Sequence, residues 1–208
     1  MKLILGSDYT FILKYGFNLT GISKSEMKIG HIITAYKVSR THIDFFKKIT
    51  ETIKENGYNI EDFDIEGKTK QEIKDFFKDK NVVYIEAGNT FYLLKAIRET
   101  GFADILKELL DEGRVYVGTS CGSYIMCPTI EVANWNQDGK DKFGITDYTA
   151  LNYVPFVLKV HYNDDKEESV RRNLKNLKHP LHILRDGQGM FCEDGICGFI
   201  GDGQEVKF

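Results

Sequence analysis

Short apolar runs and segments of helical periodicity alternate along this chain. The apolar runs predict strands, and they cover residues 2–6, 28–36, 58–63, 81–85, 115–117 and 154–160. Between them, apolar residues three and four positions apart predict amphipathic helices over residues 43–56, 71–78, 103–113 and 167–178, and a further helix through Leu93, Leu94 and Ile97. This order predicts an α/β fold, a three-layer, doubly wound, mostly parallel sheet with helices on both faces.

Turn and capping residues mark the ends of these elements. Thr69 is expected to cap the helix over 71–78, and Gly113 ends the helix that precedes the strand at 115–117. After Pro180, two or three short strands are expected around the glycines of the C-terminal stretch. No repeat, linker or low-complexity segment interrupts the pattern, so residues 1–208 are expected to form a single domain.

The composition of the chain narrows the classes of partner. Its 208 residues are 42% hydrophobic, enough for one substantial core. Lys plus Arg number 28 and Asp plus Glu 31, so the net charge of -3 provides no field to attract nucleic acid or an anionic membrane. No apolar run approaches the roughly 18 residues that span a bilayer. We therefore expect a cytoplasmic protein with neither nucleic-acid nor membrane partners.

The cysteines and histidines predict neither a disulfide framework nor a metal site. None of the four cysteines belongs to a C-x-x-C pair. Cys192 and Cys197 flank a turn and are expected to face each other across a hairpin as free thiols. Pro180 disrupts the helical spacing that would let His179 and His182 bind one metal ion, so no metal is expected.

The segment Gly118-Thr119-Ser120-Cys121-Gly122 directly follows the strand at 115–117 and precedes a short helix that Pro128 stops. A serine between two glycines in a strand-to-helix turn is typical of a nucleophile elbow, which holds the hydroxyl exposed in a strained backbone conformation. A glycine-rich turn that only packs is the alternative. Cys121 is a second candidate nucleophile, but the glycines lie two residues either side of Ser120, which favours Ser120.

A second glycine turn, at Gly88, follows the strand at 81–85. Ligands of doubly wound sheets bind outside the carboxyl ends of the strands, so this turn and Ser120 are expected to meet at one crevice. The N–H groups of Gly88 and Cys121 would then form a pair of donors for a tetrahedral oxyanion. An ordinary turn glycine is the alternative for Gly88.

A nucleophilic serine needs a base, and His161 is the histidine that ends a predicted core strand downstream of Ser120. A carboxylate should orient the imidazole and stabilise its charged form. Between Ser120 and His161 the acidic candidates are Glu131, Asp138, Asp141 and Asp147. Spacing alone does not choose among them.

Three separated motifs resemble the dipeptidase E (aspartyl dipeptidase) and cyanophycinase type of serine peptidase, from residue 81 to about residue 174. They are Gly88-Asn89-Thr90-Phe91, Ser120-Cys121-Gly122-Ser123 with Cys127-Pro128-Thr129-Ile130, and Val154-Pro155-Phe156 leading to His161-Tyr162. The resemblance implies a fold like that of class I glutamine amidotransferases, a Ser-His-carboxylate triad and no cofactor. It implies Ser120 as nucleophile, His161 as base, oxyanion donors at Gly88 and Cys121, and an acid at Asp138, with Glu131 as second choice.

The resemblance also implies a substrate, a short peptide with an N-terminal aspartate. Arg171, on the predicted helix after His161, is the expected clamp for the aspartate carboxylate. The alternative is that Arg171 and Arg172 belong only to the solvated face of a Lys-rich helix. Asn89 is the other expected substrate-binding residue. Cys121 and Ala87 depart from the family pattern, and no carboxylate falls at the usual spacing. The competing interpretations are a catalytically silent member of the fold that binds a small metabolite or partner, a thiol amidotransferase and an α/β-hydrolase esterase.

Overall fold

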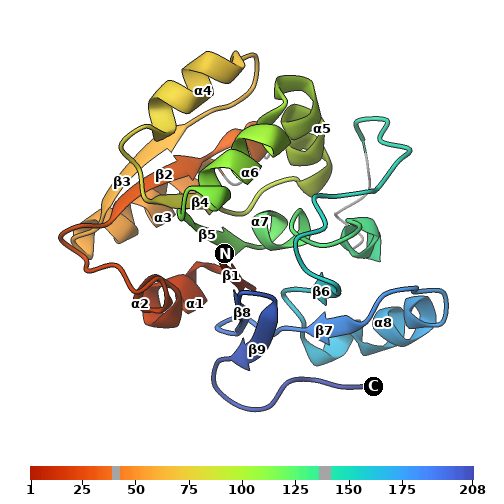
Figure 1. The fold of residues 1–208 in the computed structure, drawn as a ribbon. Coiled ribbons are helices and arrows are strands. Elements are labelled where there is room, and N and C mark those ends of the chain that lie inside the picture. Colours follow the sequence, from red (N-terminus) through yellow and green to blue (C-terminus); the bar gives the residue numbers. More distant parts are fainter. Residues whose placement is uncertain (39–42, 136–141) are drawn as a thin grey trace.

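The computed structural model describes residues 1–38, 43–135 and 142–208. A seven-stranded sheet in the order β3-β2-β4-β5-β1-β8-β9 forms the centre (Figure 1). Its strands are β1 (Lys2–Gly6), β2 (Lys28–Ile32), β3 (Asn59–Phe63), β4 (Val82–Ile85), β5 (Val115–Thr119), β8 (Gly189–Glu193) and β9 (Ile196–Ile200). The first five pair in parallel, and β8 and β9 add an antiparallel hairpin beside β1. The predicted mostly parallel sheet is confirmed.

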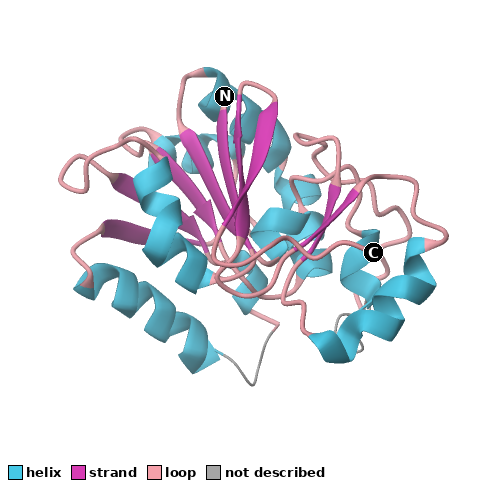
Figure 2. Cartoon of the chain, turned by 90° about the horizontal axis from the view of Figure 1, so that it is seen from below, coloured by secondary structure: helices cyan, strands magenta, loops and turns pink. Residues whose placement is uncertain are grey.

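Helices cover both faces of this sheet (Figure 2). Successive side chains of a strand point to opposite faces, so Ile4 and Tyr84 pack in one cluster with Phe17, whereas Leu5 and Val83 pack in the other. The first face carries α1 (Tyr9–Phe11), the π-helical turn η1 (Ile12–Gly16), α2 (Phe17–Leu19) and α3 (Ile43–Glu55). The second carries α4 (Lys70–Phe77), α5 (Thr90–Thr100), α6 (Phe102–Asp111) and α7 (Cys121–Tyr124). The three-layer architecture is confirmed.

Side-chain caps begin two of the outer helices. Thr69 and Glu72 form a reciprocal capping box at the start of α4, as the sequence predicts for Thr69. Asn89 caps α5, because its side-chain oxygen accepts a hydrogen bond from the N–H of Tyr92 at 2.9 Å. Gly101, at φ 67°, ends α5 and leads directly into α6.

Two predicted strands differ from those observed. The strand expected over 28–36 ends at Ile32, and the 3-10 turn η2 (Thr34–Tyr36) follows because Thr34 bonds to the Asp64 side chain and the Ile65 N–H. The strand expected over 154–160 shortens to β6 (Val157–Lys159), which pairs with β7 (Leu181–Ile183) in a separate two-stranded sheet (Figure 2). A run of apolar residues predicts that a strand is buried, but it does not predict which sheet the strand joins.

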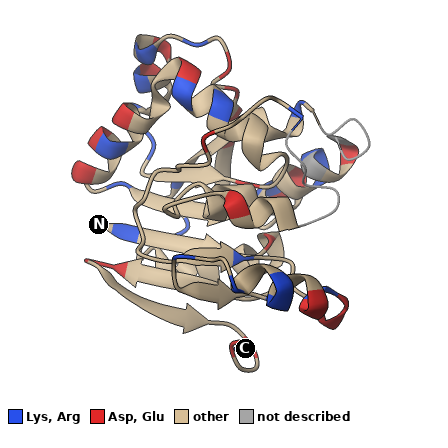
Figure 3. Cartoon of the chain, turned by 90° about the vertical axis from the view of Figure 1, so that its right-hand side faces the viewer, with Lys and Arg blue, Asp and Glu red and all other residues tan. Residues whose placement is uncertain are grey.

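The remaining described helices are the 3-10 turns η3 (Glu131–Trp135) and η5 (Asp164–Lys166), and α8 (Glu167–Leu174), which is shorter than predicted. Lys and Arg are interspersed with Asp and Glu along the outer helices (Figure 3). Within the described ranges, no helix is long and apolar enough to cross a membrane.

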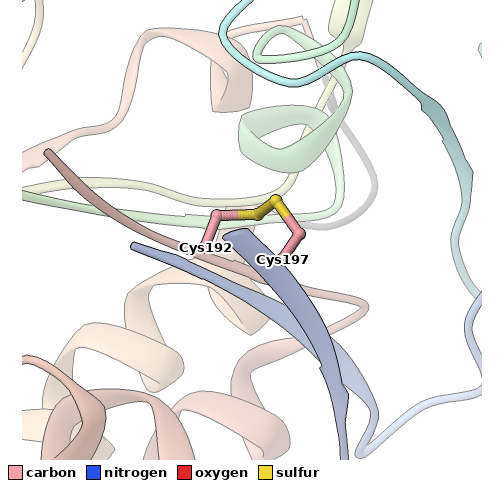
Figure 4. Close-up of a disulfide and its surroundings, with 2 residues drawn as sticks. All are labelled: Cys192 and Cys197. Carbon is pink, nitrogen blue, oxygen red and sulfur yellow. A yellow bond between two sulfur atoms is a disulfide. The ribbon is translucent and has the colours of Figure 1, made fainter. Parts of the chain in front are cut away.

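A disulfide joins Cys192 and Cys197 across the β8–β9 hairpin (Figure 4). The two residues lie directly opposite each other in the antiparallel register, with their Cα atoms 4.1 Å apart. The expected hairpin is therefore confirmed, whereas the expected free thiols at these two positions are wrong, because the register brings the sulfur atoms within bonding distance. Cys121 and Cys127 are free and buried.

Candidate active site

Ser120 lies in a tight turn between β5 and α7. Its backbone has φ 50° and ψ -111°, a region that non-glycine residues rarely adopt. A Cβ on Gly118 would lie 2.7 Å from the backbone of Gly122, and one on Gly122 would overlap the carbonyl oxygen of Ile85. Both glycines are therefore required for the close passage of strand and helix that holds Ser120 in this conformation.

His161 follows β6 and also has a positive φ, 53°. Its backbone N–H donates to the Oγ of Ser7 at 2.8 Å, and the carbonyl of His161 accepts a hydrogen bond from the Lys166 ammonium. The imidazole Nδ1 lies 2.6 Å from the Oδ1 of Asp186. This contact makes Nδ1 the protonated nitrogen of a neutral ring and leaves Nε2 as its basic atom.

Asp186 lies in the turn between β7 and β8, where its Oδ1 also accepts a hydrogen bond from the Ser7 hydroxyl at 2.9 Å. The hydrogen bond with His161 is the largest effect that holds the pKa of Asp186 below its usual value. Asp186 is not among the carboxylates expected from the sequence, because it follows His161 in the chain instead of lying between Ser120 and His161. The one local signal is an Asp-Gly pair between two short strands, which indicates a turn.

The carboxylates considered from the sequence lie elsewhere. Asp138, the expected acid, and Asp141 lie outside the described residues. Glu131 begins η3, and Asp147 pairs with Arg98 at 3.2 Å. In the part of the chain that the structure describes, Asp186 is the carboxylate that contacts His161.

A pocket of about 130 Å³ brings these groups together at the carboxyl ends of β1, β4 and β5, where the sequence predicts a crevice. Its walls include the apolar side chains of Tyr9, Phe45 and Ile49. The full lining is Asp8, Tyr9, Phe45, Ile49, Glu86, Ala87, Thr119, Ser120, His161 and Asp186. Ser120 and His161 thus share one pocket, although Ser120 follows a strand of the seven-stranded sheet and His161 follows a strand of the two-stranded sheet.

Glu86 also lines this pocket, and its carboxyl group differs from that of Asp186 because its pKa is raised instead of lowered. It follows β4 and is 1% exposed, and its Oε2 accepts a hydrogen bond from the Tyr84 hydroxyl at 2.6 Å. Burial, reinforced by the negative charges of Asp8 and Asp62, raises the pKa of Glu86 to about 8. Glu86 could not be singled out from the sequence, because a glutamate next to a glycine turn has no distinctive pattern.

Gly88 and Cys121 have the backbone geometry expected of turn donors. Gly88 has φ 99°, and a Cβ there would lie 2.5 Å from the backbone of Ala35. Neither the N–H of Gly88 nor that of Cys121 has an acceptor among the described residues. The Cys121 thiol is buried and donates to the carbonyl of Ala87 at 2.8 Å, and burial raises the pKa of the thiol, so little thiolate forms at neutral pH.

The two expected substrate-binding residues do not line this pocket. The side chain of Asn89 caps α5, as described above. The Nε of Arg171 donates to Glu167 at 2.7 Å, and its guanidinium lies 4.3 Å from the ring centroid of Phe208. Arg171 therefore faces a different depression, between α8 and the C-terminal segment.

Among the residues with described positions, no three His, Cys, Asp or Glu side chains are grouped so as to hold a metal ion.

Comparison with known proteins identifies relatives over most of the chain. A family model, Peptidase family S51, matches residues 17–198. An uncharacterised peptidase of Pasteurella multocida is 27% identical over 163 residues, 78% of this chain and 78% of that protein. Peptidase E of a Nostoc species is 26% identical over 208 residues, 95% of this chain and 82% of the relative.

The solved structures include two chains with the same fold. A candidate peptidase E of Listeria monocytogenes superposes with a TM-score of 0.81 at 23% identity, covering 97% of this chain and 98% of that one. A peptidase from an acI-B1 actinobacterium superposes with a TM-score of 0.72 at 16% identity, covering 100% of this chain and 96% of that one. The sheet order and the two helical layers described above are thus shared with these proteins.

Proposed function

Because this chain belongs to peptidase family S51, and is therefore a peptidase, we propose that it is a serine exopeptidase of short peptides with the triad Ser120, His161 and Asp186. The observation that carries this proposal is the contact of Asp186 with Nδ1 of His161 at 2.6 Å, beside the pocket that Ser120 also lines. The strained turn at Ser120 acts as the nucleophile elbow.

In the proposed reaction, Nε2 of His161 accepts the proton of the Ser120 hydroxyl as Oγ attacks the peptide carbonyl. Asp186 keeps the other ring nitrogen protonated and stabilises the imidazolium that forms. The unused N–H groups of Gly88 and Cys121 donate to the oxyanion. The imidazolium then protonates the leaving amine, and water, activated by the same base, hydrolyses the acyl-enzyme.

We place the acid at Asp186 rather than at Asp138. Asp186 meets two requirements of the role, a hydrogen bond to the correct ring nitrogen and a pKa lowered by that bond, so the carboxylate stays ionised at neutral pH. The Ser7 hydroxyl holds the same oxygen. A thiol mechanism at Cys121 has less support, because its buried thiol already donates to a backbone carbonyl.

We expect a fluorophosphonate probe to add its mass once to the wild-type protein, on Ser120. Ser120→Ala should abolish both labelling and peptide hydrolysis, whereas Cys121→Ala should keep most of each. Asp186→Asn should lower kcat by about 10³–10⁴-fold, because the imidazole then takes the wrong tautomer. Intact-protein mass spectrometry and dipeptide hydrolysis measure these outcomes.

Asp147→Asn is the matched control, since it removes an exposed carboxylate that pairs with Arg98 and should leave kcat unchanged. An Asp186→Asn enzyme as active as Asp147→Asn would remove Asp186 from the triad. A folded wild-type protein that neither labels nor hydrolyses any peptide would favour the silent member of the fold.

A further inference from the structure

The pocket beside Ser120 is lined by three carboxyl groups, those of Asp8, Glu86 and Asp186. Among its described lining residues there is no Lys or Arg. The expected substrate of the family, a peptide with an N-terminal aspartate, would place a further carboxylate against these three carboxyl groups, of which Asp186 is ionised at neutral pH. Such an arrangement is electrostatically unfavourable in a partly desolvated site.

Two of the three carboxyl groups are already used within the protein. Asp8 caps α1 and accepts hydrogen bonds from the Thr10 hydroxyl and the N–H of Gly187. Asp186 accepts from His161 and Ser7. Both contribute negative charge to the pocket, but Asp8 is held by the cap of α1 and by Gly187, and Asp186 orients His161 in the proposed triad.

Glu86 has one oxygen for which the described residues supply no hydrogen-bond partner, and, unlike Asp186, it has no part in the proposed triad. The Tyr84 hydroxyl donates to Oε2, and the Tyr84 ring is stacked on His31 with their centroids 4.7 Å apart, which fixes that bond in place. Oε1 has no hydrogen-bond partner among the described residues. A carboxyl oxygen that lines a pocket and lacks a partner is poised to accept a donor from a ligand.

Thr119 supplies a second unused polar atom next to Glu86. The parallel register pairs Ile85 with Gly118, so Glu86 and Thr119 are the next cross-strand neighbours, and both line the pocket. The Oγ1 of Thr119 is fully buried and has no hydrogen-bond partner of good geometry in the described part of the chain, although it lies near enough to the Tyr84 hydroxyl to oppose the rise that burial causes in the pKa of Tyr84. Buried polar atoms in native proteins are usually paired, so these two neighbouring oxygens can accept donors from a ligand.

We propose that Glu86 and Thr119 bind an ammonium group of the first residue of the peptide, so that the enzyme prefers a positively charged N-terminal residue to an aspartate. This inference rests on the proposed serine peptidase function of the same site. An ammonium group carries three N–H donors and one positive charge, which match two adjacent acceptors, one of them a carboxylate. The rings of Tyr9 and Phe45, which meet edge to face in the pocket wall, suit the same cation.

The electrostatics of Glu86 agree with this geometry. Burial keeps the Glu86 carboxyl mostly protonated at neutral pH, because its pKa lies at about 8. A bound cation stabilises the ionised carboxyl, so binding releases a proton to the solvent. The ammonium group has two sources in a peptide, the N-terminal amine and a lysine side chain, and the experiment distinguishes them.

The test compares hydrolysis of Lys-Leu, norleucyl-Leu and Asp-Leu with that of their N-acetylated forms at pH 7.5. If the side chain is bound, norleucine lowers kcat/KM at least about tenfold relative to lysine; if the N-terminal amine is bound, acetylation does so. A loss with norleucine supports the proposal directly, whereas a loss on acetylation, which an exopeptidase shows in any case, supports it only where Glu86→Gln makes that loss smaller. Asp-Leu should be the slowest free dipeptide. Equal rates in both comparisons, or faster hydrolysis of Asp-Leu, would overturn it.

Variants assign the effect to the two residues. Glu86→Gln and Thr119→Val should each raise KM for the preferred peptide. Each should also lower the ratio of its kcat/KM to that of the matched peptide without the ammonium group. Thr119→Ser keeps the hydroxyl and should retain the wild-type ratio, and an unchanged ratio in Glu86→Gln would overturn the assignment.

A binding measurement separates failure of this inference from failure of the proposed function. Calorimetry with n-butylamine on the inactive Ser120→Ala protein should detect binding that is lost in the Ser120→Ala/Glu86→Gln double variant. If the wild type labels at Ser120 but no ammonium is bound or preferred, only the inference fails. If the wild type hydrolyses no peptide, the proposed function fails, and amine binding still decides the site.

Discussion

Ser7 shows how a single buried side chain can organise a site. It follows β1, the first strand of the chain, and is fully buried. Its hydroxyl accepts the backbone N–H of His161 at 2.8 Å and donates to Asp186 at 2.9 Å. One hydroxyl thus fixes the backbone of the proposed base and the carboxylate of the proposed acid, which makes Ser7 a positioning residue.

Ser7→Ala should lower kcat about tenfold and change KM little, because the loss of one hydrogen bond to a charged group loosens Asp186 and leaves the His161 N–H unpaired. Steady-state kinetics and the rate of fluorophosphonate labelling should fall together. Ser23→Ala, in an exposed loop, is the control. Reduced stability with an unchanged kcat would show a purely structural role for Ser7.

At the scale of elements, the site depends on how closely α7 approaches β4 and β5. Gly122 lies in α7 and touches the carbonyl of Ile85, at the end of β4. Gly118, in β5, faces the backbone of Gly122. The positive φ of Ser120 follows from this close approach, since a larger residue at either position would push the helix outward and relax the turn.

Gly122→Ala should destabilise the protein by roughly 1–3 kcal/mol or more, because its Cβ meets a backbone carbonyl that cannot rotate away. It should also abolish labelling of Ser120 by displacing the turn. Gly198→Ala, in β9, is the matched control, since a Cβ there meets nothing within 4 Å. Chemical denaturation measures the difference, and equal midpoints for the two variants would contradict this account.

For the whole molecule, buried ionisable groups shape the dependence of stability on pH. Burial raises the pKa of Glu86 from 4.5 to about 8 and lowers that of Lys159, in β6, from 10.5 to about 8. Between pH 4.5 and 8 the unfolded chain has lost the Glu86 proton that the folded protein keeps, so stability falls. Above pH 8 the unfolded chain keeps the Lys159 proton that the folded protein has lost, which opposes a further fall, but above pH 9 it also loses the thiol protons of Cys121 and Cys127, whose pKa values burial raises, so stability falls again.

The free energy of unfolding should therefore fall between pH 5 and 8, with a slope of up to about 1.4 kcal/mol per pH unit, level off between pH 8 and 9, and fall again above pH 9. Denaturant titrations from pH 5 to 10 measure the curve. Glu86→Gln should flatten the fall below pH 8, and Lys159→Met should turn the level region between pH 8 and 9 into a fall. A free energy of unfolding that rises between pH 5 and 8 in the wild type would contradict the assignment.

The layers of the molecule were predictable because the spacing of apolar residues and the residues that form turns and caps are properties of short stretches of sequence. Alternating apolar runs and helical spacing placed the strands of the main sheet and the cap at Thr69. The pairing of β6 with β7 and the position of Asp186 were not, because they depend on contacts between segments far apart in sequence. Ser120 and His161 carried local signals, a glycine-flanked turn and a strand end, whereas Asp186 and Glu86 gain their surroundings only from the folded chain.

The strand order also bears on biosynthesis. β1 lies between β5 and β8 in the sheet, so the hydrogen bonds of β1 are complete only after β8 has been synthesised. In the proposed mechanism a nascent chain that has already exposed Ser120 still lacks Asp186. Hydrolytic competence therefore requires translation at least as far as Asp186, and products that stalled ribosomes truncate before this residue would be inert toward the peptides around them.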